Sequence, residues 1–397
     1  MSPFQRRWRV TRIACTLALG GAATACGDPP PAPPLGADSS AALVVRSPAP
    51  AWEDGGAWRI AEEPTFRLAL GGRDERGRPP VTGAARTLDG AVFVLAPDGW
   101  LIRHAGRQRD TVPLPPEAGA ADWLEAAPDG RGLLTFARRT GHAADLAADG
   151  SVRAAARLLG LAGAPQPILV GALDDGRWIA TAIAPALPRT PGAARDPLLL
   201  LRYGRDGGPA TVLDTLPGYE AWIFLAEEVL DLALVPFGRF SVVQVEGALI
   251  HGGANDAWSV DTRTADGALV RSAVLELPLR PVDEAEFDAM LRGRLRADPL
   301  EAKAEVASGT FEELPRPATA PAFGRILADP AGRLWLADFA PDGQAATTWT
   351  VLDADGSWLG SVALPDGLRL EQVGDDWVLG KVEVDRKWQV RVHSIER

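Results

Sequence analysis

Short apolar runs, each ended by a glycine-containing turn, recur from about Ala84 to the end of the chain. The clearest turn signal is the dipeptide Asp-Gly, which occurs eleven times. A two-residue type I′ hairpin turn needs positive φ at both central positions, which Gly adopts freely and Asp tolerates. The pattern therefore predicts a succession of β-hairpins.

The hairpins group into repeated units. The first strands of the units are expected near Ala84, Asp122, Ile168, Arg239, Gly324 and Arg369. Most units show the same order of strand, Gly turn, strand, loop, strand, Gly turn and strand. Four short antiparallel strands of this kind form one blade of a β-propeller. We therefore predict an all-β fold, a six-bladed β-propeller of four-stranded antiparallel blades.

The last unit is one strand short. After Arg369 the chain offers only three strands, whereas Trp58–Ala61 and Phe66–Leu70, before the first unit, are unused β candidates. We predict that this N-terminal segment completes the last blade. Such a strand would close the ring and cover sheet edges that otherwise promote aggregation.

Two inserts interrupt the even spacing of the units. The segment Leu216–Phe237 is expected to form a short helix or an irregular strand pair. The second insert, 279–321, lies between blades 4 and 5. Asp283 can cap a helix there that presents Phe287, Leu291 and Leu295 on one face. Either insert can overhang the mouth of the propeller as a lid or pack down to cover apolar surface.

The N-terminal region has the features of an export signal and a tether. Four arginines precede a short apolar stretch, and residues 1–25 are therefore interpreted as a signal peptide. The following Pro-rich segment, 26–52, is expected to be a spacer that begins at a lipid-modified Cys26. Plain secretion with an unmodified Cys26 is the alternative. The propeller body would then comprise residues 53–397.

The units resemble a known family. The segments Ala328–Asp338 and Val373–Gly380 are similar to those of the six-bladed β-propeller lipoproteins of environmental bacteria, which are related to NHL-repeat propellers. The Ala-Cys junction at Cys26 resembles a bacterial lipobox, although Ala23 stands where that motif usually carries Leu. The resemblance implies the fold and an anchor at the outer membrane, facing the periplasm or the cell surface. It implies little about chemistry, because fold and function are separable.

Loops between second and third strands share one face of a propeller with the links between blades. Candidate ligand-binding residues on that face are Asp98, Arg138, Arg139, Arg189, Arg195, Asn255, Asp256, Asp385 and Arg386. Convergent arginines can bind a carboxylate, sulfate or sugar acid through paired hydrogen bonds. Ordinary solvated loop charge is the competing explanation for each of them.

No catalytic residue or metal site can be named from the sequence. The four histidines are isolated and are expected at half-buried or surface strand positions. The tryptophans expected to pack between blades are Trp100, Trp178, Trp258, Trp335, Trp349, Trp358, Trp377 and Trp388. No serine-hydrolase elbow or zinc motif occurs, and turn formation accounts for the Asp-Gly pairs without calcium.

The sequence favours a binding or assembly scaffold that presents a loop face to a protein or to a small anionic or carbohydrate ligand. A calcium-dependent lactonase-like hydrolase that uses the central channel is the alternative. Asn255, the single asparagine, is expected in an outer loop, which weakens that alternative. A quinone-dependent sugar dehydrogenase would need more channel-lining His, Arg and Gln than the sequence suggests. No cofactor is implied.

The acidic net charge of the chain limits the classes of partner that it can bind. The net charge is −11, with only three lysines and no basic cluster, which argues against nucleic acid. Contact with the membrane is expected only through the anchor, and the protein is expected to be a monomer.

Overall fold

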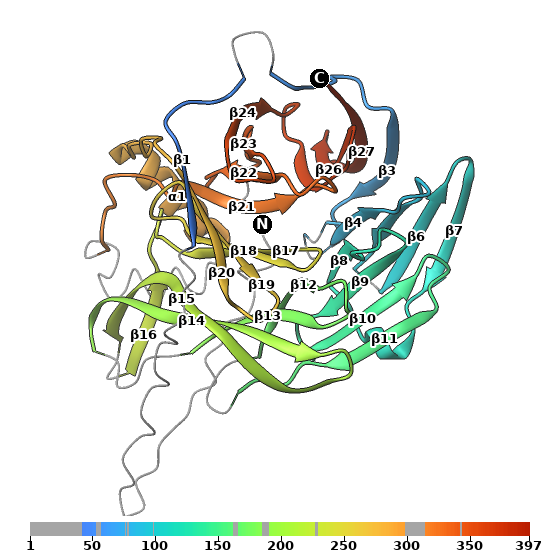
Figure 1. Cartoon of the computed structure of the whole chain (residues 1–397), viewed down its shortest axis with the longest axis horizontal. Coiled ribbons are helices and arrows are strands. Elements are labelled where there is room, and N and C mark those ends of the chain that lie inside the picture. Colours follow the sequence, from blue (N-terminus) through green and yellow to red (C-terminus); the bar gives the residue numbers. More distant parts are fainter. Residues whose placement is uncertain are drawn as a thin grey trace, which may run out of the picture.

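The computed structural model describes residues 42–52, 57–75, 77, 79–97, 99–161, 166–184, 190–226, 229–297, 314–341 and 344–397. Within these ranges the chain is all-β, with one α-helix and one short 3-10 turn, η2 (Pro116–Ala118). The strands form antiparallel sheets of four or five strands, an arrangement consistent with a propeller (Figure 1). No helix in the described part of the chain is long and apolar enough to span a bilayer.

Six sheets are present among the described residues. The first contains β4 (Gly83–Arg86), β5 (Val92–Leu95), β6 (Trp100–Ala105) and β7 (Gln108–Pro113). The second contains β8 (Trp123–Ala126), β9 (Gly132–Ala137), β10 (His142–Ala147) and β11 (Val152–Arg157). The third contains β12 (Ile168–Ala172), β13 (Trp178–Ile183), β14 (Gly192–Gly204), β15 (Gly207–Ala226) and β16 (Val229–Leu234).

The remaining three sheets use strands from both ends of the chain. The fourth contains β17 (Ser241–Glu246), β18 (Leu249–Ala254), β19 (Ser259–Thr264), β20 (Leu269–Leu275) and β1 (Leu43–Ser47). The fifth contains β21 (Phe323–Ala328), β22 (Leu334–Asp338), β23 (Thr348–Leu352) and β24 (Trp358–Ala363). The sixth contains β25 (Arg369–Val373), β26 (Trp377–Val384), β27 (Lys387–Glu396), β2 (Arg59–Ile60) and β3 (Phe66–Gly72).

The first strand of every sheet starts within two residues of the position predicted from the turn pattern. These strands lie towards the middle of the molecule in Figure 1. Contacts between sheets run from β4 to β8, from β9 to β12, and then through β17, β21 and β25 back to β4. Asp-Gly turns recur at two points of the unit, between the first and second strands, as at 129–130, and between the third and fourth strands, as at 149–150, so the turn signals locate the repeated unit.

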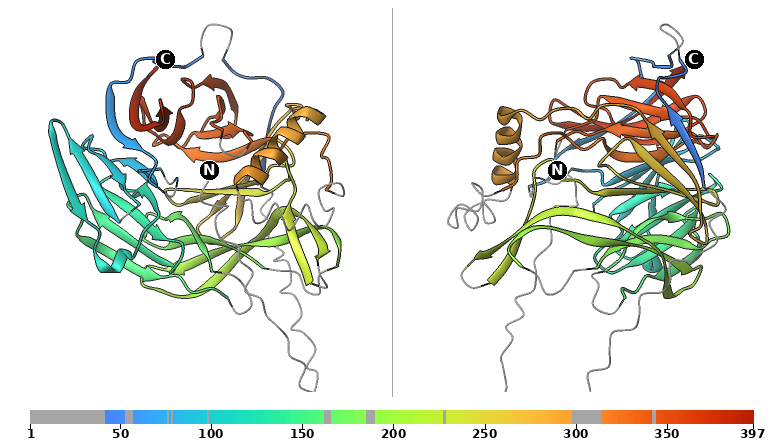
Figure 2. Two further views of the ribbon diagram at one scale, coloured as in Figure 1. Left: turned by 180° about the vertical axis from the view of Figure 1, so that it is seen from behind. Right: turned by 60° about the vertical axis from the view of Figure 1, so that its left-hand side comes forward.

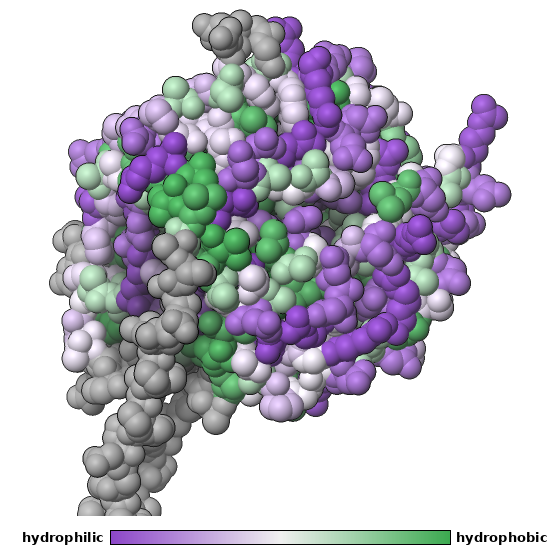
Figure 3. All heavy atoms as spheres, in the orientation of Figure 1, coloured by the Kyte–Doolittle hydropathy of each residue, from purple (hydrophilic) through white to green (hydrophobic). Residues whose placement is uncertain are grey.

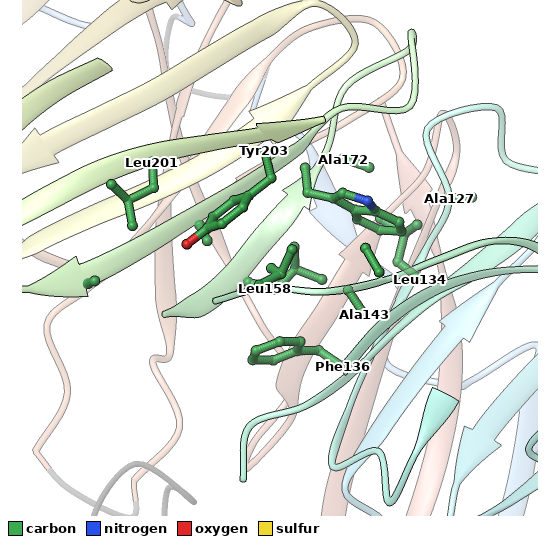
Figure 4. Close-up of a cluster of buried hydrophobic side chains, with 13 residues drawn as sticks. Ala127, Leu134, Phe136, Ala143, Leu158, Ala172, Leu201 and Tyr203 are labelled. Atoms are coloured by element: carbon green, nitrogen blue, oxygen red, sulfur yellow. The ribbon is translucent and has the colours of Figure 1, made fainter. Parts of the chain in front are cut away.

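The cores lie between neighbouring sheets. Figure 4 shows the core between the second and third sheets, where Leu134 and Phe136 of β9 lie near Tyr203 of β14 and Leu158. The indole Nε1 of the buried Trp178 donates to the carbonyl of Arg205, which satisfies its polar atom. Most of the tryptophans expected in the core are buried, but Trp100 is 43% exposed, so the prediction for Trp100 is wrong.

The N-terminal segment runs along the outer edges of three sheets. β1 pairs parallel with β20, the backbone N–H of Trp52 donates to Leu359 O beside β24, and β2 and β3 pair antiparallel with β27. The segment predicted to add strands to the last sheet therefore does pair with it. The spacer predicted over 26–52 is wrong at its C-terminal end, because Leu43–Ser47 is a strand. Residues 26–41 of the predicted spacer, and the predicted signal peptide, lie outside the described residues.

Both inserts lie on one side of the sheets (Figure 2). For the first insert, a short helix and an irregular strand pair were the two expected alternatives, and the structure shows strands. β14 and β15 are long, and β16 pairs with the end of β15. The second contains α1 (Glu284–Ala297), capped by Asp283, whose Oδ1 accepts from the backbone N–H of Glu286 at 2.6 Å. Phe287 and Met290 of α1 are buried against Phe237. The helix is thus packed down onto apolar surface.

Packing of β3 supplies a test of the N-terminal pairing. Leu68 is buried in a cluster with Val81, Val92 and Trp388, so it joins the first sheet to the last. Leu68→Ala is expected to lower the free energy of unfolding by about 2–4 kcal/mol, measured by chemical denaturation. Arg67→Ala, at the neighbouring exposed position, should change it by less than about 0.5 kcal/mol. Equal effects of the two substitutions would contradict the pairing.

Candidate functional site

Four first strands each carry a polar side chain beside a buried apolar residue. These residues are Glu125 of β8, Gln244 of β17, Arg325 of β21 and Glu371 of β25. Alternation along a strand explains the placement, because the neighbours Leu124 and Leu370 are buried in the cores between sheets. These four residues form the central cluster with Lys381 of β26 and with Arg138, which follows β9.

Direct contacts link most of the central cluster. The Nε2 atom of Gln244 donates to Glu125 Oε1 at 3.1 Å, across two sheets. Lys381 Nζ lies 2.8 Å from Glu371 Oε1, and Arg325 Nη2 lies 3.9 Å from Glu371 Oε2. Arg325 also donates to the carbonyl of Leu370. Gln244 and Glu125 form one bonded pair, Lys381, Glu371 and Arg325 form a second group, and the charges of Arg325 and Glu371 act on Glu125.

Glu125 has an unusual protonation equilibrium. Burial raises the pKa of its carboxyl to about 7, and the charge of Glu371 acts in the same direction, while the Gln244 hydrogen bond and the charge of Arg325 oppose the shift. Its side chain is surrounded by protein yet keeps some accessible surface, since the residue is only half-buried. Glu125 can thus be charged or neutral near neutral pH.

Arg138 extends the central cluster towards the insert side of the molecule. Burial lowers the pKa of its guanidinium, and the charges of Asp122 and Glu371 raise it. The backbone N–H of Arg138 also donates to Asp122 Oδ1 at 3.1 Å. Of the residues predicted on the loop face, Arg138 is the one that approaches the central cluster.

The other predicted residues are placed in different surroundings. Arg195 Nη1 lies 3.0 Å from Asp256 Oδ1, so these two form an ion pair between the third and fourth sheets. Arg139 is exposed, and Asp385 and Arg386 form the β26–β27 turn with φ of 49° and 63°. Asp98 and Arg189 lie outside the described residues. The structure does not bring this predicted set together into one site.

Asn255 is a correction to the sequence prediction. Instead of lying in an outer loop, it is fully buried, and its side chain spans the start of two first strands. Its Oδ1 accepts from Phe240 N–H at 2.8 Å and its Nδ2 donates to Phe323 O at 2.9 Å. Because both ends of the amide have backbone partners, Asn255 has a structural role in joining the fourth and fifth sheets.

Two histidines also differ from expectation. His251 and His393 are fully buried rather than half-buried. Burial, with the nearby charge of Arg271, lowers the pKa of His251 to about 4, and its Nδ1 lies 3.2 Å from Thr262 Oγ1. Among the described residues, no three His, Cys, Asp or Glu side chains lie close enough together to hold a metal ion.

Five members of the central cluster were missed at the sequence level. Glu125, Gln244, Arg325 and Glu371 each lie within a first strand, but they stand at different distances from the following Gly turn, so the turn pattern gives no signal for them. Lys381 lies on a second strand and has no such signal.

The chain has only distant similarity to the known proteins named below. No family model matches the sequence, and a search of curated proteins finds no match. Similar solved structures include a gluconolactonase from Xanthomonas campestris, with 14% identity, 85% of this chain and 98% of that chain covered, and a TM-score of 0.40. A calcium-binding regucalcin from Agrobacterium tumefaciens has 12% identity, coverage of 90% and 97%, and a TM-score of 0.36. Because each TM-score is below 0.5, these similarities carry no functional argument.

Removing the amide of Asn255 tests its structural role. Asn255→Ala leaves the buried N–H of Phe240 and the carbonyl of Phe323 without their partner, which is expected to cost about 2–4 kcal/mol of unfolding free energy. Asp256→Ala at the next position removes a partly exposed ion pair and should cost about 1 kcal/mol or less. Denaturation midpoints measure both, and a mild effect of Asn255→Ala would contradict the assignment.

Proposed function

We propose that the chain is an envelope-anchored binding protein, a closed six-bladed β-propeller whose central cluster binds a small anionic or carbohydrate ligand. The observation that carries the proposal is the convergence of Glu125, Gln244, Arg325 and Glu371 from four different sheets into one connected polar set. Residues that form a binding site typically meet in this way, because a rigid scaffold holds each one in place.

The sheet contacts support the six-bladed, closed architecture. The contacts between sheets pass from β4 through all six sheets and return to β4. The last sheet gains β3 from the N-terminal segment, whose strand pairs with β27 over Phe66–Gly72. A ring of this kind brings the first strands of every blade to a shared axis, which is where the polar side chains of the central cluster lie.

The composition of the central cluster supports a polar ligand. Arg325 is 42% exposed at its side chain, whereas Glu371 and Lys381 are 14% and 16% exposed, so Arg325 is the member most open to a ligand. Glu125 and the amide oxygen of Gln244 add acceptors for hydroxyl groups, whereas the amide nitrogen of Gln244 already donates to Glu125 and to the carbonyl of Val245. Among the described residues that were predicted on the loop face, Arg138 would line the approach to the central cluster.

The calcium-dependent lactonase alternative finds less support in the described residues. Its defining ligands are Glu, Asn and Asp around one ion, but the side chain of Asn255 already bonds two backbone groups. No group of three metal-binding side chains occurs among the described residues. Binding of a ligand by the central cluster does not require a group of metal-binding side chains.

Substitution of Arg325 tests the binding function. Arg325→Gln is expected to weaken binding of D-glucuronate or D-glucose by about tenfold or more, because it removes a charged donor of the site. Arg67→Gln, an exposed arginine on β3, should bind as the unsubstituted protein does. Isothermal titration measures both variants. Failure of both sugars to bind would contradict the proposal, and calcium-dependent lactone turnover would favour the alternative.

The location of the protein is a separate part of the proposal. A signal peptide over 1–25, a lipid on Cys26 and a spacer up to the start of β1 would hold the body at the outer membrane. Mass spectrometry of the native protein is expected to find an N-terminal Cys26 carrying acyl chains, and Cys26→Ser should move the protein to the soluble fraction. A native protein with unmodified Cys26 in the soluble fraction would contradict the anchor.

A further inference from the structure

We propose that the central cluster binds a small carboxylate anion together with one proton, which Glu125 takes up from water. This inference rests on the proposed function, since it names the ligand class and the regulation of the same site. Three observations carry it: the partners of each cation in the cluster, the exposure of Arg325, and the groups that face Glu125.

The partners of the cations identify Arg325 as the anion-binding group. Lys381 Nζ lies 2.8 Å from Glu371 Oε1 and forms an ion pair with it. The guanidinium of Arg138 interacts electrostatically with the carboxylates of Asp122 and Glu371. Arg325 has only a loose contact with Glu371 at 3.9 Å and gives one N–H to the carbonyl of Leu370. A guanidinium carries five N–H donors in a planar fork, which matches the two oxygens of a carboxylate. Arg325 is therefore more exposed than Lys381 and less closely paired with Glu371, so it is the cation assigned to the anion.

The groups around Glu125 couple anion binding to protonation. Gln244 of β17, Arg325 of β21 and Glu371 of β25 face its carboxyl. The positive charge of Arg325 stabilises the ionised carboxylate of Glu125, and Glu371 opposes ionisation. An anion bound to Arg325 offsets that positive charge, so Arg325 no longer stabilises the ionised carboxylate of Glu125. The protonated form of Glu125 then becomes the favoured form, so the anion and the proton bind together.

The sign of the pH dependence follows from this coupling. The pKa of Glu125 is about 7 without ligand, and the bound anion raises it further. Below pH 7 the proton is already present, so affinity is nearly constant. Above pH 7 binding must take up a proton, and the affinity for the anion falls by up to about tenfold per pH unit. A neutral sugar leaves the charge of Arg325 in place and shows no such slope.

The experiment is isothermal titration of the purified protein with D-glucuronate and with its neutral counterpart D-glucose, between about pH 6 and pH 9. For D-glucuronate, the unsubstituted protein is expected to lose about tenfold in affinity per pH unit above pH 7. Titrations in buffers of different ionisation enthalpy should show uptake of about one proton per anion at about pH 8. Glu125→Gln, a neutral substitute of the same shape, should bind D-glucuronate with no pH dependence.

Glu246→Gln is the matched control. Glu246 lies two residues after Gln244 on β17, and its pKa is also raised by burial, but its charged neighbours are Asp174 and Asp329 rather than the central cluster. This variant should retain the pH dependence of the unsubstituted protein. If Glu125→Gln fails to fold, the proton uptake measured on the unsubstituted protein decides whether anion binding is coupled to protonation.

The outcomes separate this inference from the function on which it rests. Equal binding of D-glucuronate and D-glucose at all pH values would overturn the proton-coupled anion site and leave the central cluster as a sugar site. A pH dependence that persists in Glu125→Gln, or that disappears in Glu246→Gln, would also overturn it. Failure of both sugars to bind at any pH would overturn the proposed function and this inference with it.

Discussion

The pairing of β3 with β27 is the constraint on which the rest of the structure depends, because it joins residues from opposite ends of the chain. β3 packs Leu68 between the first sheet and the last, where Val92 and Trp388 contact the same cluster. Without that strand the outer edge of β27 would be open, and the first and sixth sheets would share less apolar surface. The N-terminal segment therefore acts as a structural element rather than as a flexible lead into the body.

Strand alternation then explains how apolar cores and a polar centre coexist. On β21, for example, Ile326 packs into the core on one side of the sheet and Leu327 into the core on the other, while Arg325 of the same strand belongs to the central cluster. Glu125 follows the buried Leu124, and Glu371 follows the buried Leu370. A register slip of one residue would place carboxylates in the cores at a cost of several kcal/mol each, roughly. The apolar packing thus fixes where the polar groups of the central cluster lie.

Much of the fold could be predicted because its signals are local. An Asp-Gly turn and the apolar run beside it are contiguous in sequence, and Asp283 lies next to the helix that it caps. The residues of the candidate site were harder to predict, because they are far apart along the sequence. Glu125 and Gln244, for example, meet only through the arrangement of the sheets. Asn255 shows the same difficulty, since its backbone partners at Phe240 and Phe323 belong to two sheets. Sequence distance, not weak propensity, limited these predictions.

The charge balance of the central cluster gives a reason for involving a proton. Together with Asp122, which accepts from the backbone N–H of Arg138, the central cluster is neutral when every group is ionised, because Arg138, Arg325 and Lys381 then balance Asp122, Glu125 and Glu371. A permanent surplus of positive charge would favour an anion, but without ligand it would leave a partly buried cation uncompensated, which costs several kcal/mol, roughly. Above pH 7, where Glu125 is mostly ionised without ligand, its protonation creates the surplus charge mainly when an anion arrives to compensate it. The raised pKa of Glu125 is then a consequence of burial that the site can use.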